Sequence, residues 1–392
     1  MQPWQPPEPA MTVRVPVQSS LLTWARERAG VSPEEVASRF PAIDDWEAGR
    51  KQPTLKQLEK FATAMRTPVG YLFLPEPPEE HLPVPDFRTM SDVEIGHASP
   101  DLLDIIYQCQ QRQEWYRDYS RLHRELPVPF VGTFTVGMDV AEAASQMSAV
   151  LNFAPGERGS TWSEAAQRLR DEADQLGVLV MISGVVGSNT HRKLDPHEFR
   201  GFALADELAP VIFINGSDTK AAQIFTLAHE LVHIWLGDSG VDDADMRSTP
   251  TNTTERWCNE VAAEFLLPAA SLQGVSINPD DLTADLQRLA RHFKVSTLVV
   301  LRRLFDAGFL TQSQYRIAYG EELDRILALL EERTRGGGNF YNTQPLRVSK
   351  RFARALIEST REGQTLHRDA FQMLGFKKIS TFNELAIRLG AP

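Results

Sequence analysis

The sequence has few cysteines and no long apolar run. Only Cys109 and Cys258 occur among 392 residues, far apart in the chain. Two cysteines build no disulfide framework and are typical of a reducing compartment, so we expect a cytoplasmic location. No apolar stretch reaches the ~18 residues that a membrane-spanning helix needs. Residues 1–9 are rich in Pro and Gln and lack the pattern of a signal peptide, so no membrane partner is expected.

Positive charge is also scarce. The chain has 41 Lys and Arg against 52 Asp and Glu, a net charge of −11, which argues against a general affinity for nucleic acid. The net negative charge is unevenly distributed along the chain, because residues 339–392 hold nine Lys and Arg against four Asp and Glu. Hydrophobic residues at 42% and charged residues at 24% are ordinary for a globular protein, and the length allows two or three domains.

Hydrophobic periodicity and Pro or Gly clusters divide the chain into five parts. Helical patterns dominate, but the stretch from Gly177 to Ile214 contains three β-rich segments, which predicts an α+β fold that is mostly helical with a small sheet. The expected parts are a disordered tail at 1–18, a helical domain at 19–75, a Pro-rich linker at 76–98, a central domain with helical additions at 99–335 and, after Gly336–Gly338, a basic helical domain at 339–392.

One segment has the pattern of a metal site. His229 and His233 are four residues apart, so on a helix both rings share one face and can bind one Zn²⁺. Glu230 follows the first His and can reach a water on the metal without being a ligand. Zinc lowers the pKa of such a water to ~7, and a carboxylate can then take its proton. The neighbouring Leu227 and Trp235 indicate a buried helix. Charged side chains are rarely buried unless they are paired or bind a metal.

A catalytic zinc needs a third protein ligand, and the next helix offers three glutamates. At ~100° per residue, Glu255, Asn259 and Ala262 share one face, whereas Glu260 and Glu264 point elsewhere. We therefore predict Glu255 as the third ligand and Asn259 as a hydrogen-bonding partner in the second shell.

Two alternatives to Glu255 stay open at this point. Cys258 lies near the same face and zinc accepts thiolate, although a buried, inert cysteine is more common. Glu260 is the other candidate ligand. Glu264 is expected to face solvent or a partner.

These two motifs resemble the ImmA/IrrE family of metallo-endopeptidases. The resemblance rests on Phe225–His233 and on the pattern of Glu, Cys, Asn, Ala and Leu in Glu255–Pro268, within a match over about residues 160–270. It implies a zincin-like peptidase domain of the gluzincin type, with zinc held by His229, His233 and Glu255 and with Glu230 as the catalytic base. The preceding strand resembles the family's edge strand, where a peptide substrate could add, which implies substrate-binding residues at Val211, Ile212, Phe213 and Ile214.

Residues 19–75 resemble a phage-repressor-type helix-turn-helix domain. The resemblance is carried by Trp46, Gly49, Pro53, Leu55 and Leu58. The segment between Ala37 and Trp46 is short for a turn and a recognition helix, and Asp44, Asp45 and Glu47 would repel phosphates. DNA binding through this domain is one expectation, and docking to a protein is the other.

The order of these two domains in the chain also resembles a subgroup of the family. In that subgroup, such a peptidase domain follows a helix-turn-helix domain. Asp86–Thr89 after the linker and Asn339–Pro345 before the tail carry this resemblance. It implies a toxin partner and an antitoxin role. The sequence thus predicts a regulatory zinc endopeptidase that cleaves or sequesters a specific protein. The alternative is a DNA-binding regulator or antitoxin whose zinc site is structural or silent.

Overall fold

The computed structural model describes residues 13–80, 82–85, 98–242, 252–278, 281–332 and 346–391. The chain forms two compact units, Met1–Leu82 with Gly96–Leu103 and Pro83–Ile95 with Asp104–Pro392. The Asp86–Thr89 and Asn339–Pro345 motifs and the Gly336–Gly338 break lie outside the described residues. Among the described helices, none is long and apolar enough to cross a membrane.

The first unit is all-α, as its periodicity predicts. Ser32 accepts a hydrogen bond from the Glu35 amide, and Thr54 forms a reciprocal capping box with Gln57, so the starts of the helices that follow Ser32 and Thr54 are fixed by local side-chain caps. The third helix has only five residues and carries Asp44 and Asp45 in its first turn. The elements are α1 (Ser19–Arg28), α2 (Pro33–Arg39), α3 (Ile43–Glu47), α4 (Leu55–Ala64) and the 3-10 helix η1 (Val69–Phe73).

The expected disordered tail at 1–18 needs correction in its last residues. Arg14 forms an antiparallel bridge with Thr54, the Val15 amide donates to the Pro53 carbonyl at 2.9 Å, and the Val17 amide donates to the Gln52 side chain at 3.0 Å. An extended segment can satisfy its backbone groups by pairing with another extended segment, which a Pro-rich composition does not reveal.

The two described ends of the predicted 76–98 linker are attached to different units. Glu80 forms an ion pair with Arg28 of α1. The Pro85 carbonyl accepts a hydrogen bond from the Val241 amide at 3.0 Å. The boundary between the units therefore falls inside the predicted linker, at residues 82–83.

The second unit is built around a four-stranded sheet with the order β1-β3-β2-β4. β1 runs parallel to β3, and the other pairs are antiparallel. The strands are β1 (Leu179–Ser183), β2 (Gly201–Leu204), β3 (Val211–Asn215) and β4 (Gly240–Asp242). β3 is paired on both sides, so the expectation that it is an edge strand is wrong. Its backbone groups already bond to β1 and β2 and offer no free edge to a peptide.

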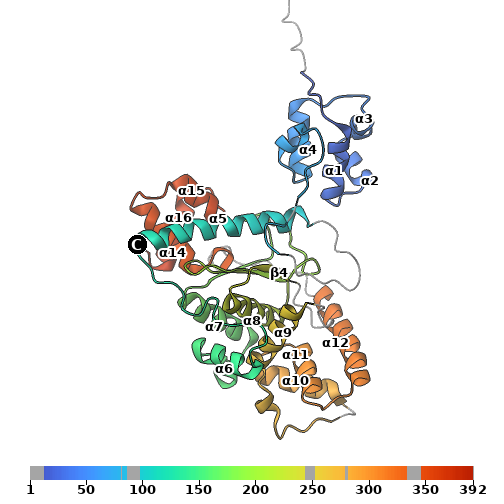
Figure 1. The fold of residues 1–392 in the computed structure, drawn as a ribbon. Helices are drawn as coiled ribbons and strands as arrows, with labels where there is room; N and C mark the ends of the chain where they lie inside the picture. The colour runs from blue at the N-terminus through green and yellow to red at the C-terminus, as the bar shows by residue number, and fades with distance from the viewer. Residues whose placement is uncertain are drawn as a thin grey trace, which may run out of the picture. The chain divides into compact units, whose positions relative to one another are not determined.

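Helices cover both faces of this sheet, and α5, α14, α15 and α16 lie opposite α7 and α8 (Figure 1). Strand residues that point to opposite faces are therefore both buried, as in Ile212 and Phe213. The helices are α5 (Pro100–His123), α6 (Val140–Val150), α7 (Trp162–Gln175), α8 (Lys220–Leu236), α9 (Thr253–Leu266), α10 (Leu282–Phe293), α11 (Thr297–Asp306), α12 (Gln312–Glu332), α14 (Lys350–Arg361), α15 (His367–Leu374) and α16 (Ile379–Leu389).

The C-terminal helices belong to the second unit and are not a separate domain. Val348 and Phe352 are fully buried. Ser349 donates to Asp174 at 2.7 Å, and the Lys350 ammonium pairs with Asp171 at 3.1 Å, so the start of α14 is fixed to α7. The predicted independent domain at 339–392 is thus corrected for its described part, because apolar residues on α14 pack into the larger unit.

Candidate metal centre

The helix that carries the histidines begins and ends at strong local signals. Thr219 accepts a hydrogen bond from the Ala222 amide at 3.1 Å, which caps the start of α8. Gly237 follows the helix with φ of 76°, a left-handed conformation that a glycine adopts without a Cβ penalty. Nearly every residue between Gln223 and Trp235 is buried, so α8 is a core helix.

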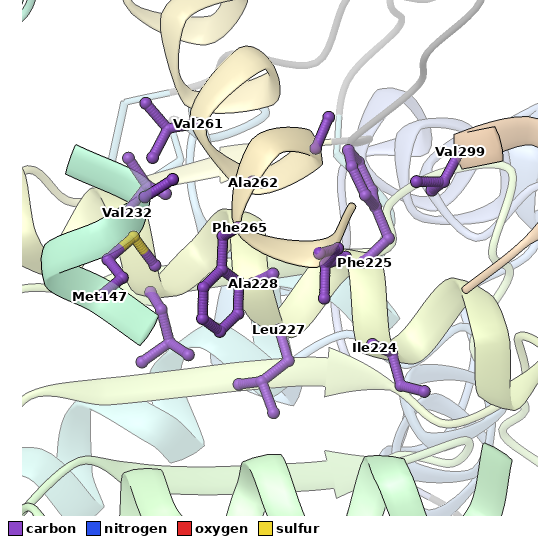
Figure 2. Packing of buried hydrophobic residues seen from close by; sticks show 14 of the residues in the cluster. Met147, Ile224, Phe225, Leu227, Ala228, Val232, Val261, Ala262, Phe265 and Val299 are labelled. Atoms are coloured by element: carbon purple, nitrogen blue, oxygen red, sulfur yellow. The ribbon is translucent and has the colours of Figure 1, made fainter. Parts of the chain in front are cut away.

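The glutamate helix α9 packs directly against α8. Figure 2 shows Ala228 of α8 close to Ala262 of α9, with Val261 and Phe265 beside them. The small side chains let the two helix backbones approach closely, which places the first turn of α9 beside the histidines. The small alanines on α9 therefore allow the close packing of the two helices.

Three side chains from these helices converge on one point. The Nε2 atoms of His229 and His233 are 3.0 Å apart. His229 Nε2 lies 3.2 Å from Glu255 Oε2, and His233 Nε2 lies 3.3 Å from Glu255 Oε1. Among the described residues, this is the one group of three or more His, Cys, Asp or Glu side chains that could hold a metal ion.

The distances fit a single metal ion. Ligands at ~2.0–2.1 Å around a tetrahedral zinc lie ~3.3 Å from one another. The two Nε2 atoms are 3.0 Å apart, and they lie 3.2 and 3.3 Å from the two different carboxylate oxygens of Glu255, so all three separations are close to that value. Two imidazoles and one carboxylate are also a donor set found in catalytic zinc sites. The structure therefore brings together all three predicted ligands.

The electrostatics of the site favour an ionised Glu255. Burial by itself raises the pKa of this carboxyl group, but hydrogen bonds and charge interactions with His229 and His233 outweigh it and lower the pKa below the ordinary value. A carboxylate must be deprotonated to bind a metal, so this direction suits a ligand.

Glu230 is fully buried on α8, and the backbone of the neighbouring strand β2 leaves space for its side chain. A Cβ atom placed on Gly201 of β2 would lie 2.9 Å from Glu230 Oε1, 2.6 Å from Thr226 Cγ2 and 3.0 Å from the Phe213 carbonyl oxygen. Only glycine fits this position without a shift of its neighbours. Gly201 was not among the sequence candidates, although a glycine within a strand pattern is a signal of close approach.

The other candidates lie outside the ligand group. The Asn259 Oδ1 atom is buried and has no hydrogen-bond partner among the described residues. Cys258 is a buried core residue. The expectation that Glu264 faces solvent or a partner is wrong, because it pairs with Arg303 of α11 and also accepts from the Ala269 amide at 3.1 Å.

Comparisons with known proteins agree with this geometry. Residues 173–305 match the IrrE N-terminal-like domain, Peptidase_M78. This match contains β1 to β3, most of α11, and the helices α8 and α9 that carry the three candidate ligands. It covers a minority of the chain and supports the resemblance to the ImmA/IrrE family there. Residues 348–388 match a domain of unknown function, DUF8813. No curated protein and no solved structure matches the chain. The match suggests a metallopeptidase-like domain.

Proposed function

We propose that the protein is a zinc-dependent endopeptidase with a regulatory role, which acts on a specific protein partner. The observation that carries this proposal is the triangle of His229, His233 and Glu255 with Glu230 on the same helix. A zinc ion at this triangle would supply the Lewis acid that peptide hydrolysis needs. A toxin partner, and with it an antitoxin role, is the form of this proposal that the resemblance of the flanking segments favours.

The roles of the chain's own residues follow from their positions. A zinc ion would be held by ring nitrogens of His229 and His233 and by the carboxylate of Glu255. Glu230, the residue after His229 on α8, would accept a proton from the attacking water and pass it to the departing amine. Asn259 lies one turn after Glu255, and its Oδ1 atom is buried with no partner among the described residues. It can therefore accept a hydrogen bond from a group beside the metal ligands.

The corrected sheet order changes the expected position of the substrate. Since Val211–Ile214 lie in an interior strand, a peptide cannot add to β3. β4 is the edge strand on the β2 side of the sheet. Its residue Asp242 pairs with Gly201, which lies beside Glu230. Substrate addition is therefore proposed at the β4 side of the sheet. There the Pro85 carbonyl already accepts a bond from the Val241 amide, so the substrate would have to displace it.

A second candidate function is a regulator or antitoxin whose metal site is structural or silent. It is favoured by the burial of the site, because Glu230, the two histidines and Glu255 are at most 1% exposed. A catalytic zinc keeps one open position, whereas a structural site is closed. DNA binding by residues 19–75 belongs to this second candidate. It is weakened by the five-residue α3 with its two aspartates.

Glu230→Gln separates the two functions, because it removes the proton acceptor and preserves the size of the side chain. Full-length wild type and Glu230→Gln would be incubated with extract of the native cells, and new protein N-termini would be identified by mass spectrometry. We expect the wild type to generate specific cleavages that Glu230→Gln does not, while the variant retains the uncut protein. Equal biological activity of the two proteins without any cleavage would establish the second candidate.

A further inference from the structure

A small cavity lies on the face of the sheet opposite the metal helix α8. Its empty space is about 250 Å³, including its mouth, and its lining includes Ile105, Gln108, Arg112, Ser183, Phe213 and Arg347. Leu374 and Gly375, at the end of α15, complete one wall. The cavity thus joins α5, the end of β1 and the C-terminal helices within the second unit. It is separate from the metal centre.

Arg112 is one of two arginines in this cavity and is only 6% exposed. Its Nε donates to the Met373 carbonyl at 3.1 Å, and its Nη1 lies 3.6 Å from the Met181 sulfur. Its guanidinium also hydrogen-bonds to the side chain of Cys109. The adjacent Cys109 gives no counter-charge, because burial raises the pKa of its thiol to about 12. Arg112 therefore retains donor capacity and an incompletely balanced charge.

Arg347 is the second arginine, and it differs from the cations of α14, which begins three residues later. Four of these are engaged within the chain: Lys350 with Asp171, Arg351 with the Tyr116 hydroxyl, Arg354 with the Leu389 carbonyl and Arg361 with the Ala391 carbonyl. Arg347 forms no hydrogen bond or ion pair with any described residue. Burial lowers the pKa of its guanidinium with no counter-charge to offset the effect.

The other lining groups are compatible with a negative ligand. Among the described residues that line the cavity, none is an aspartate or a glutamate. Gln108 offers an amide that can donate a hydrogen bond. Two guanidinium groups that line one partly buried space repel each other and lose part of their hydration, and an anion between them offsets both costs.

A purely structural role accounts for only part of this arrangement. Arg112 bonds to the carbonyl of Met373 in the last turn of α15, where the helix end carries partial negative charge. That contact explains why one arginine is buried here. It leaves Arg347 without a role, since this side chain has no carbonyl or carboxylate acceptor in the described part of the chain.

We propose that this cavity binds a small inorganic anion, a halide or a single oxyanion, between Arg112 and Arg347. Both arginines donate to it, and Arg347 belongs to the segment that leads into α14. The bound anion would therefore fasten the C-terminal helices to α5 and to the end of β1. The narrow space excludes a nucleotide or a peptide. This proposal does not depend on the peptidase proposal.

The test is an anion titration of the full chain, followed by thermal unfolding and by calorimetry. Sodium chloride and sodium phosphate would be titrated separately, with ionic strength held constant by sodium gluconate, whose anion is too large for the cavity. We expect saturable binding that raises the unfolding temperature of the wild type. Saturation by chloride assigns a halide, saturation by phosphate assigns an oxyanion, and competition between the two assigns one shared site.

Arg347→Gln is the decisive variant, because Arg347 is only half-buried and its replacement leaves the Arg112 contact to α15 intact. It should weaken anion binding about tenfold or more, and Arg347→Lys should restore part of it. Arg368→Gln is the matched control, since it removes one positive charge from an 83% exposed side chain of α15 and should bind like the wild type. Absence of saturable binding by the wild type, or equal affinities of wild type and Arg347→Gln (an adventitious ion only), would overturn the proposal.

Discussion

Gly201 shows how closely the sheet approaches the acidic residue of the metal centre. An alanine there would place its Cβ 2.9 Å from Glu230 Oε1 and 2.6 Å from Thr226 Cγ2. We expect Gly201→Ala to displace Glu230, to reduce any proteolysis at least ~10-fold and to lower the free energy of unfolding by ~1–3 kcal/mol, the usual range for overpacking. Metal binding should persist, because the three atoms nearest to the added Cβ belong to Thr226, Glu230 and Phe213 and not to the three ligands.

Gly156→Ala is the control for that variant, since nothing lies within 4 Å of its added Cβ. Activity assays and urea unfolding of both variants would be compared with the wild type. A Gly201→Ala protein with the stability and activity of the wild type would show that this close approach is not needed.

The Cys109 thiol gives a pH dependence with a defined sign. Burial raises its pKa to about 12 in the folded protein, above the ~8.5 of an exposed thiol. The neutral thiol thus contributes stability that is complete below the unfolded value and is lost as pH rises from ~8.5 toward about 12.

The expected result is a free energy of unfolding that falls from ~pH 8 to ~pH 11, with a smaller fall in Cys109→Ala. Urea unfolding at each pH measures both values. Tyr116, whose pKa burial also raises to about 12, contributes to the fall in both proteins and cancels in the comparison. Identical falls in the two proteins would contradict a buried, neutral thiol at this position.

At the level of elements, the sequence predicts the existence and the ends of most helices. The capping boxes of α4 and α7 and the glycine after α8 are local signals, and the structure has each of them. The choice of Glu255 also follows from local geometry, because the positions that share a helix face depend only on the 100° rotation per residue.

The sequence does not predict the order of the strands in the sheet, or which side chains from distant segments contact each other. An alternating or apolar pattern predicts a strand but not its neighbours. The edge position that the family resemblance implies for Val211–Ile214 is wrong, because β3 lies between β1 and β2. β4 has three residues, too few for a pattern. Glu264 reads as solvent-exposed until α11 brings Arg303 to it, 39 residues further along the chain.

Arg158 connects the C-terminal ends of α9 and α10. Only 1% of it is exposed, and it donates to the carbonyls of Phe265 and Leu266 at the end of α9 and of Phe293 at the end of α10. Arg158→Met should lower the free energy of unfolding by ~3 kcal/mol or more, because several buried acceptors lose their donor.

Urea denaturation would test this prediction with Arg168→Met as the control. Arg168 also donates to two carbonyls, those of Glu157 and Asn152, but at a solvent-exposed site where water can replace it. Equal, small losses in both variants would show that Arg158 is not a structural link between α9 and α10.

At the level of the whole molecule, the structure changes what the basic C-terminal segment is expected to do. The sequence predicts a separate basic helical domain at residues 339–392. The described helices instead bury Val348, Phe352 and Leu356 within the second unit. Composition reveals the charge of a segment but not which of its charges are used inside the chain.

Deletion of residues 346–392 should therefore expose the apolar surface that α14 covers on α5, α7 and β1. We expect the truncated protein to aggregate or to unfold at least ~5 °C lower, because loss of buried apolar area reduces the free energy of unfolding. Size-exclusion chromatography and thermal unfolding measure this. A monomeric truncated chain with the unfolding temperature of the wild type would restore the idea of an independent domain.

The central claim is that His229, His233 and Glu255 form one zinc site, and metal content tests it most directly. Proteins purified under the same conditions would be analysed by mass spectrometry for bound metals. We predict one zinc per chain in the wild type and in Glu230→Gln, and less than about one tenth of that in His229→Ala and Glu255→Ala, since each removes one of three ligands. Wild-type protein without zinc, or full zinc occupancy in Glu255→Ala, would contradict the claim.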